Sequence, residues 1–308
     1  FGLPFSADDP RPLQVLGQAG YTLARFDQAT NAFVPFTAAD NAEHGELWTP
    51  VVPGWDLVIE LLLPAAEVAA LELELGSVNQ GYRGFGLDRE PESGSCNMDV
   101  ACLTAEAPWA QWREVARAVG VISTGGSTFC TGSLLNNTAQ DKKMLFMTAY
   151  HCGVHASNAA SLVVYWNYEN STCRVPGSAQ SGQGGNGSLS QFHTGAYLRA
   201  EYSGSDFTLV ELAGPPVAAF NHYWAGWDRT PYTAPGGPGN GDHACGPEPA
   251  ALCAAIHHPN TDEKRITFVE TNTATTGYNN PVSPGAGTHV HAYWDPTPIF
   301  PPNPGQAI

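Results

Sequence analysis

The stretch that decides the fold reads Lys143-Met144-Leu145-Phe146-Met147-Thr148-Ala149-Tyr150-His151-Cys152-Gly153. Its apolar run predicts a buried strand over 143–149, and that strand leads directly into a histidine followed by a cysteine. A disulfide at Cys152 would fix the backbone beside the imidazole. His151 is therefore a candidate general base at the end of a strand.

A second segment, Ser205-Asp206-Phe207-Thr208-Leu209-Val210-Glu211-Leu212, alternates apolar and polar residues, which predicts a half-buried strand with Asp206 at its mouth. A carboxylate there can accept the imidazole N–H and hold the histidine in one tautomer. Taken singly, a histidine beside a cysteine is usually structural, and an aspartate at a strand start is usually a turn residue. Together, in this order, His151 and Asp206 favour catalysis.

Composition limits the alternatives. The 308 residues suffice for two domains, and 33 glycines, 25 prolines and only 14% charged residues favour turn-rich β structure. The formal charge of -16 would repel phosphate backbones, so we expect no nucleic-acid partner. No run reaches the ~18 apolar residues of a membrane span. The longest candidate, 57–63, is interrupted by Glu60.

Residues 1–92 are predicted to form a β-rich domain and linker. Residues 21–26 and 33–36 flank a turn and suggest a hairpin, and 56–63 and 71–75 are predicted strands. The polar segment 84–95 is rich in Gly, Pro and Ser, which is typical of an exposed linker.

From Cys96 onward, short apolar segments are separated by turn residues. This spacing predicts an all-β sandwich or barrel. The predicted strands are 116–123, 143–149, 161–168 and 206–212.

Seven cysteines lie at spacings that give no C-x-x-C pair with histidine partners. We therefore expect disulfides in an exported protein instead of a zinc site. Cys245 and Cys253 could pair within the Pro- and Gly-rich loop 230–253, and an odd count leaves one thiol without a partner.

Several segments between Ser93 and about Trp294 are distinctive when they are taken together. They are Ser93-Gly94-Ser95-Cys96-Asn97-Met98-Asp99-Val100, Cys130-Thr131-Gly132-Ser133-Leu134-Leu135-Asn136-Asn137-Thr138, Thr148-Ala149-Tyr150-His151-Cys152-Gly153, Val164-Tyr165-Trp166-Asn167-Tyr168, Ser171-Thr172-Cys173-Arg174, Ser205-Asp206-Phe207-Thr208-Leu209, Trp224-Ala225-Gly226-Trp227-Asp228-Arg229 and Ile256-His257-His258-Pro259. In this order they resemble the bacterial lysyl endopeptidase family of trypsin/chymotrypsin-like serine proteases, and so many matches in one order make chance an implausible explanation.

The resemblance implies a trypsin-like protease domain over 93–308 with two Greek-key β-barrels and the active site between them. The first barrel would span about 105–215, and 216–308 would supply part of the second. His151 would be the general base and Asp206 its orienting carboxylate.

The resemblance also implies the disulfides Cys130–Cys152 and Cys102–Cys173. Cys96 would pair with a cysteine beyond the nucleophile, which this chain lacks, so we expect it to be unpaired here. Residues 92–95 resemble the start of a mature enzyme, which makes 1–92 a pro-domain. No lysine precedes Ser93, so we expect cleavage after Arg89 or by another protease.

The family's Gly-x-Ser-Gly nucleophile turn is absent, and neither Ser133 nor Ser205 has glycines on both sides. We expect a secreted, monomeric endopeptidase zymogen acting on proteins or peptides, with its serine beyond residue 308, so that this chain is inactive. The alternative is a non-catalytic pseudoprotease that acts as a binding or inhibitory module.

Two histidine clusters offer metal-type ligands. His257 and His258 lie near Asp262 and Glu263, without a helical register, and the segment 289–291 places two imidazoles on one face of a strand. We expect neither to be a metal site, and we expect no cofactor.

Overall fold

The computed structural model describes residues 14–15, 22–27, 32–37, 40, 42–51, 58–62, 64–70, 73–79, 93–103, 109–227, 253–269, 274–277 and 289–292. Within these ranges the chain is almost entirely β, and its one α-helix is α1 (Ala110–Ala116). This composition agrees with the all-β architecture that the spacing predicts and with the trypsin-like fold that the resemblance implies.

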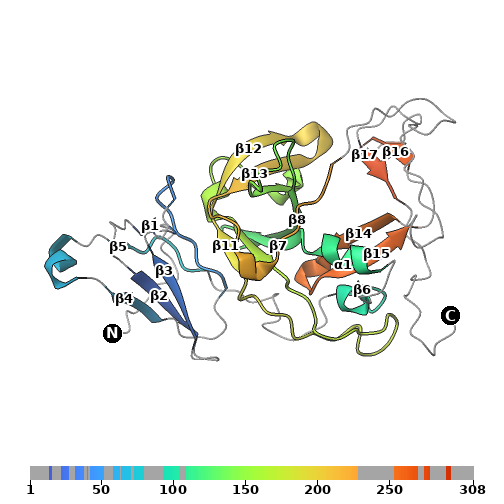
Figure 1. Ribbon diagram of the computed structural model, residues 1–308, viewed down its shortest axis with the longest axis horizontal. Coiled ribbons are helices and arrows are strands. Elements are labelled where there is room, and N and C mark those ends of the chain that lie inside the picture. The colour runs from blue at the N-terminus through green and yellow to red at the C-terminus, as the bar shows by residue number, and fades with distance from the viewer. Residues whose placement is uncertain are drawn as a thin grey trace.

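The central feature is a seven-stranded antiparallel sheet that curls into a half-barrel (Figure 1). Its strand order is β11-β10-β7-β8-β9-β13-β12, so four of its six pairings join consecutive strands, while the pairings of β7 with β10 and of β9 with β13 join strands further apart in the sequence. The strands are β7 (Val119–Thr124), β8 (Thr128–Leu135), β9 (Leu145–Thr148), β10 (Val163–Trp166), β11 (Phe192–Thr194), β12 (Ala196–Tyr202) and β13 (Phe207–Leu212).

Alternating residues of these strands fill the inside of the half-barrel. Phe146 and Trp166 meet there edge to face, with ring centroids 5.7 Å apart. Gly132 on β8 has no room for a side chain, because a Cβ would collide with the ring of Phe146 and the carbonyl oxygen of Met147. The interior cluster also contains Ile122, Leu134, Met144, Val154, Ala159, Leu162, Val164, Ala196, Val210 and Leu212.

A second, three-stranded sheet has the order β14-β15-β6 and packs against α1. Its strands are β14 (Cys253–His257), β15 (Arg265–Val269) and β6 (Met98–Asp99), and β16 (Ala274–Thr276) pairs separately with β17 (His289–His291). Figure 1 places α1, β14 and β15 together beside the half-barrel. The prediction of a strand from residue 116 was wrong at its start, because Ala116 ends α1 and the strand begins at Val119.

The N-terminal region forms the sheet β3-β2-β4, drawn in blue in Figure 1. The predicted hairpin is confirmed, since β2 (Thr22–Asp27) pairs antiparallel with β3 (Ala32–Thr37). β4 (Val58–Leu62) flanks β2, while β1 (Gln14–Val15) pairs with β5 (Leu73–Glu74) and a 3-10 helix spans Ala65–Ala70.

Residues 42–51, which lie between β3 and β4 in the sequence, contact the half-barrel. The backbone N–H of Val51 donates to the hydroxyl oxygen of Tyr165, and that of Glu43 to the hydroxyl oxygen of Tyr197, each at 2.9 Å. Trp48 and Val51 also pack on the outward side chains of the β7–β10 pair. Consequently β7 and β10 are buried on both faces, although a barrel surface is normally half exposed.

Across the described part of the chain, no helix has both the length and the apolar character needed to cross a membrane.

Candidate active site

The end of β9 positions the predicted base. After Thr148 the chain turns through a 3-10 helix, Tyr150–Cys152, and leaves it at Gly153, whose φ of 69° is left-handed and suits glycine. The hydroxyl of Thr148 donates to the carbonyl oxygen of Thr131 on β8 at 2.8 Å. His151 therefore lies on a short turn, and the hydrogen bond of Thr148 anchors the end of β9, just before this turn, to β8.

Strand pairing brings the predicted carboxylate to the same place. Thr208 on β13 pairs with Thr148 on β9, and Asp206 lies two residues before Thr208 while His151 lies three after Thr148. Asp206 follows a 3-10 helix, Ser203–Ser205, and adopts a left-handed backbone conformation with φ 54°. Aspartate tolerates this region better than most residues, so the sequence suits the turn.

The two side chains meet at two points. Nδ1 of His151 lies 2.7 Å from Oδ2 of Asp206, and the backbone N–H of His151 donates to Oδ1 at 2.9 Å. The imidazole is 64% exposed, whereas Asp206 is 17% exposed, so the ring has an open side and its orienting partner is covered. An open imidazole edge beside a covered carboxylate is the arrangement that a general base requires.

Electrostatics fix the tautomer. Burial alone would raise the pKa of Asp206, but the hydrogen bonds from the backbone N–H and the ring of His151 outweigh it and lower the pKa of this carboxyl. The ionised carboxylate only accepts hydrogen bonds, so Nδ1 carries the proton and Nε2 is the acceptor. Nε2 can then take a proton from a hydroxyl placed at the open edge.

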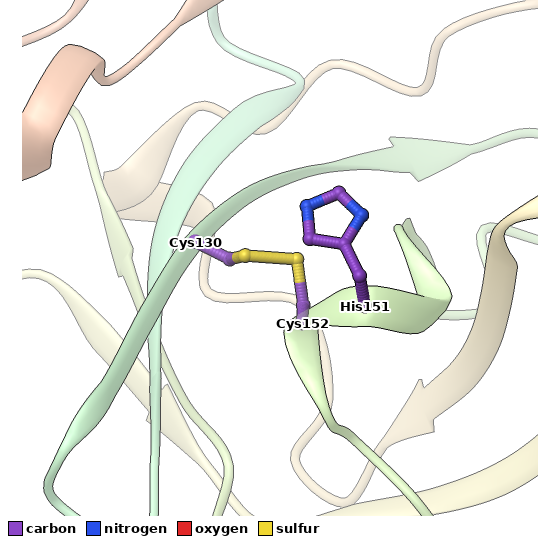
Figure 2. Close-up of side chains that lie close together, drawn as sticks. All are labelled: Cys130, His151 and Cys152. Atoms are coloured by element: carbon purple, nitrogen blue, oxygen red, sulfur yellow. A yellow bond between two sulfur atoms is a disulfide. The ribbon is translucent and has the colours of Figure 1, made fainter. Parts of the chain in front are cut away.

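A disulfide lies next to the ring. Cys152 is bonded to Cys130 on β8, and Figure 2 shows this bond beside the imidazole of His151. Ligand-type atoms of these three residues lie within 4.8 Å of one another, as in a metal site. Both sulfurs are used in the disulfide, however, so the group restrains the backbone at His151 and provides no thiolate pair for a metal.

The remaining cysteines divide into bonded and free. Cys102 and Cys173 form the other disulfide that the resemblance implied, with Cα atoms 4.5 Å apart. Cys253 is disulfide-bonded, and its predicted partner Cys245 lies outside the described residues. Cys96 is an exposed free thiol.

A buried ionic network lies beside the Cys102–Cys173 disulfide. Arg174 forms a two-point ion pair with Asp99 and a further ion pair with Glu263 at 3.0 Å. Arg265 is paired with the same Asp99 and with Asp262, at 3.0 and 2.6 Å. Through Asp99, the network joins residues 93–103 to Arg174, which follows the disulfide, and to the segment 262–265.

This network bears on two sequence predictions. Ser93 is buried and its hydroxyl donates to Asp262, whereas Gly94 and Ser95, which end the predicted linker 84–95, are exposed. His258 is buried and stacked on Tyr168, and its Nδ1 donates to the carbonyl oxygen of Asp262 at 3.0 Å. Burial, followed by the nearby Lys264, lowers the pKa of His258 to about 3, so it is a neutral core residue.

The sequence reading missed two arrangements. One is the ionic network, whose signal was the occurrence of Asp99, Arg174 and Asp262 inside apolar or cysteine-bearing segments. The other is a second histidine–carboxylate pair, His155 with Glu201, which no sequence pattern indicates. The serines Ser133 and Ser205 lie on β8 and in the turn before Asp206, and among the described residues no serine hydroxyl hydrogen-bonds to His151.

A curled antiparallel sheet that presents a His–Asp pair from the ends of adjacent strands places this chain in the class of trypsin-like all-β folds. The comparisons with known proteins agree. The family model for the lysyl endopeptidase C-terminal domain matches residues 91–297. The chain is 31% identical over 257 residues to the lysyl endopeptidase of Pseudomonas aeruginosa, and the match covers 79% of this chain. The chain belongs to the lysyl endopeptidase family.

The same match covers 50% of that relative, so the chain spans about half the length of the curated protein it resembles.

Proposed function

We propose that this chain is part of a secreted serine endopeptidase zymogen in which His151 is the general base and Asp206 its orienting carboxylate. One observation carries the proposal: Nδ1 of His151 lies 2.7 Å from the covered carboxylate of Asp206 while the ring stays open on its other side. In a serine protease the histidine removes the hydroxyl proton and then returns a proton to the leaving amine, while the aspartate holds the imidazole in place.

The nucleophile is proposed to lie in the part of the protein that follows residue 308. Two observations support this. No serine in the 308 residues stands in a Gly-x-Ser-Gly turn, and the matched relative is about twice as long as the matched region. A cysteine in the same following part would also bond Cys96, which is exposed and free here. Residues 1–308 alone are then expected to hydrolyse nothing through the triad.

The N-terminal region, residues 1–92, is proposed to be a pro-domain, and 93–308 part of the protease domain. The hydrogen bonds from residues 42–51 to Tyr165 and Tyr197 support a pro-domain that packs against the protease domain before cleavage. N-terminal sequencing of the processed protein tests the boundary. A start near residues 90–93 agrees with it, and a start far from them contradicts it.

Preference for lysine is proposed from the relative's name alone. The test is hydrolysis of matched peptide amides that carry Lys, Arg or Leu before the scissile bond, by the full-length protein. We expect Lys to be cleaved fastest and the His151→Ala variant to be inactive on all three. A full-length protein that cleaves none of them would favour the pseudoprotease alternative.

A further inference from the structure

Two histidine–carboxylate pairs connect the same two segments of the chain. His151 pairs with Asp206, and four residues later His155 pairs with Glu201, with Nδ1 of His155 2.7 Å from Oε2 of Glu201. The second pair is partly exposed, at 37% for His155 and 31% for Glu201. The proposed reaction does not use the second pair, and its position beside the first needs an explanation.

Asp206 lies in the turn that joins β12 to β13. β12 is an edge strand of the seven-stranded sheet, and its pairing with β13 is interrupted by a register shift between Leu198 and Ala200. Asp206 follows this strand through the exposed 3-10 helix Ser203–Ser205. Glu201 lies on the last part of β12, after the irregularity and before that turn, so a contact at Glu201 restrains the segment that carries Asp206.

The base side is connected to His155 by a closed turn. The side-chain amide of Asn158 donates to the carbonyl oxygen of Gly153 at 2.8 Å, while its oxygen accepts the backbone N–H of His155 at 2.7 Å. Gly153 ends the 3-10 helix that carries His151. The ring of Tyr150, which precedes His151, also packs edge to face against His155 with centroids 5.1 Å apart. His155 is therefore connected to the turn that carries His151 in two ways, through the hydrogen bonds of Asn158 and through the ring of Tyr150.

We propose that His155 and Glu201 are positioning residues that hold the turn carrying His151 against the end of β12, so that the imidazole stays aligned with Asp206. Neither residue is proposed to touch substrate. The proposal rests on the assignment of His151 as the base. Exposed ion pairs contribute little to the free energy of unfolding. We therefore expect loss of the His155–Glu201 pair to change the alignment of His151 and to leave global stability nearly unchanged.

The first test uses residues 1–308. It measures motion of the His151 ring, so it does not require the nucleophile. The probe is the NMR order parameter of the His151 ring, which reports fast ring motion. We expect this order parameter to fall in Glu201→Ala and in His155→Ala, and to fall no further in the double variant, because the two residues act as one unit. Glu201→Gln keeps an oxygen that accepts the Nδ1–H, so it should retain most of the rigidity.

The matched control is Arg199→Ala. Arg199 lies on the same strand and forms an exposed ion pair with Glu211 at 2.8 Å, and neither His155 nor Glu201 takes part in that pair. This variant should leave the His151 ring unchanged. An unchanged ring in both Glu201→Ala and His155→Ala, or an equal fall in Arg199→Ala, would overturn the proposal.

The second test uses the full-length enzyme. Glu201→Ala and His155→Ala are expected to lower kcat about two- to fivefold, as for the loss of one exposed pair, with KM nearly unchanged. Glu201→Gln should restore most of kcat. A change in KM alone would indicate a substrate-binding role and contradict positioning. If the full-length protein has no activity, the proposed function fails while the NMR test still decides the positioning role.

Discussion

Asp99 and Arg174 form a two-point ion pair inside the molecule, with Nε of Arg174 donating to Oδ2 at 2.9 Å and Nη2 to Oδ1 at 2.7 Å. Asp99 is 0% exposed and forms a second ion pair, with Arg265, at 3.0 Å. Removing one partner of a buried pair leaves the other charge uncompensated, which typically costs about 3–5 kcal/mol. We predict a loss of this size in the free energy of unfolding for Asp99→Ala, measured by denaturant titration with the disulfides intact.

The control for that prediction is Glu114→Ala, which removes the exposed pair between Glu114 and Arg117. It should change the free energy of unfolding by about 1 kcal/mol or less. Equal effects of the two variants would contradict the structural role assigned to the buried network.

The Cys130–Cys152 disulfide closes a loop of 22 residues. Chain-entropy reasoning assigns such a loop about 3 kcal/mol of stabilisation. We predict that the double variant Cys130→Ala/Cys152→Ala unfolds at correspondingly lower denaturant concentration, and that its His151 turn is protected less well against hydrogen exchange. A variant with lower stability but unchanged protection at residues 150–153 would show that the disulfide does not restrain the base.

The hydroxyl of Tyr165 accepts a hydrogen bond that links the N-terminal segment to the half-barrel. Tyr165→Phe keeps the ring in its buried cluster but removes the acceptor for the N–H of Val51, which should cost about 1 kcal/mol or slightly more. Tyr202→Phe is the control, because Tyr202 is exposed and its substitution should be close to neutral. Thermal unfolding of residues 1–308 measures both, and equal stability of the two variants would argue against the contact.

His258 predicts a pH dependence. The pKa of His258 is about 3 in the folded chain, below the ordinary value of 6.5. Between these two pH values the unfolded chain therefore binds a proton at His258 and the folded chain does not. Stability should therefore fall as pH drops below about 6.5, with this residue contributing at most about 1.4 kcal/mol per pH unit. His258→Phe keeps a ring on Tyr168 and should show a shallower loss between pH 6.5 and 4. An unchanged slope would contradict the buried neutral state.

The sequence located the half-barrel well because its signals are local. The apolar run before His151 and the alternation after Asp206 correspond to β9 and β13, and their antiparallel pairing then brings the two residues together. The Cys130–Cys152 and Cys102–Cys173 pairs were accessible only through family resemblance, since spacing alone does not select partners.

The rest depended on tertiary context. The segment around Ala116 has strand-like composition, yet its first part ends α1 because Trp109, Ala116 and Phe268 share one buried cluster. Ser93 is polar and flanked by linker-type residues, but Asp262, far along the chain, buries it. Such long-range charge pairing leaves no periodic signal, and the His155–Glu201 pair escaped prediction for the same reason.

The most direct test of the central claim is labelling of the full-length protein with a serine-directed fluorophosphonate, followed by mass spectrometry of the labelled peptide. If His151 and Asp206 activate a nucleophile, one serine beyond residue 308 should be labelled, and His151→Ala should abolish the labelling. Absence of labelling in the wild-type full-length protein, or labelling unaffected by His151→Ala, would contradict the assignment of this pair as a catalytic base and its carboxylate.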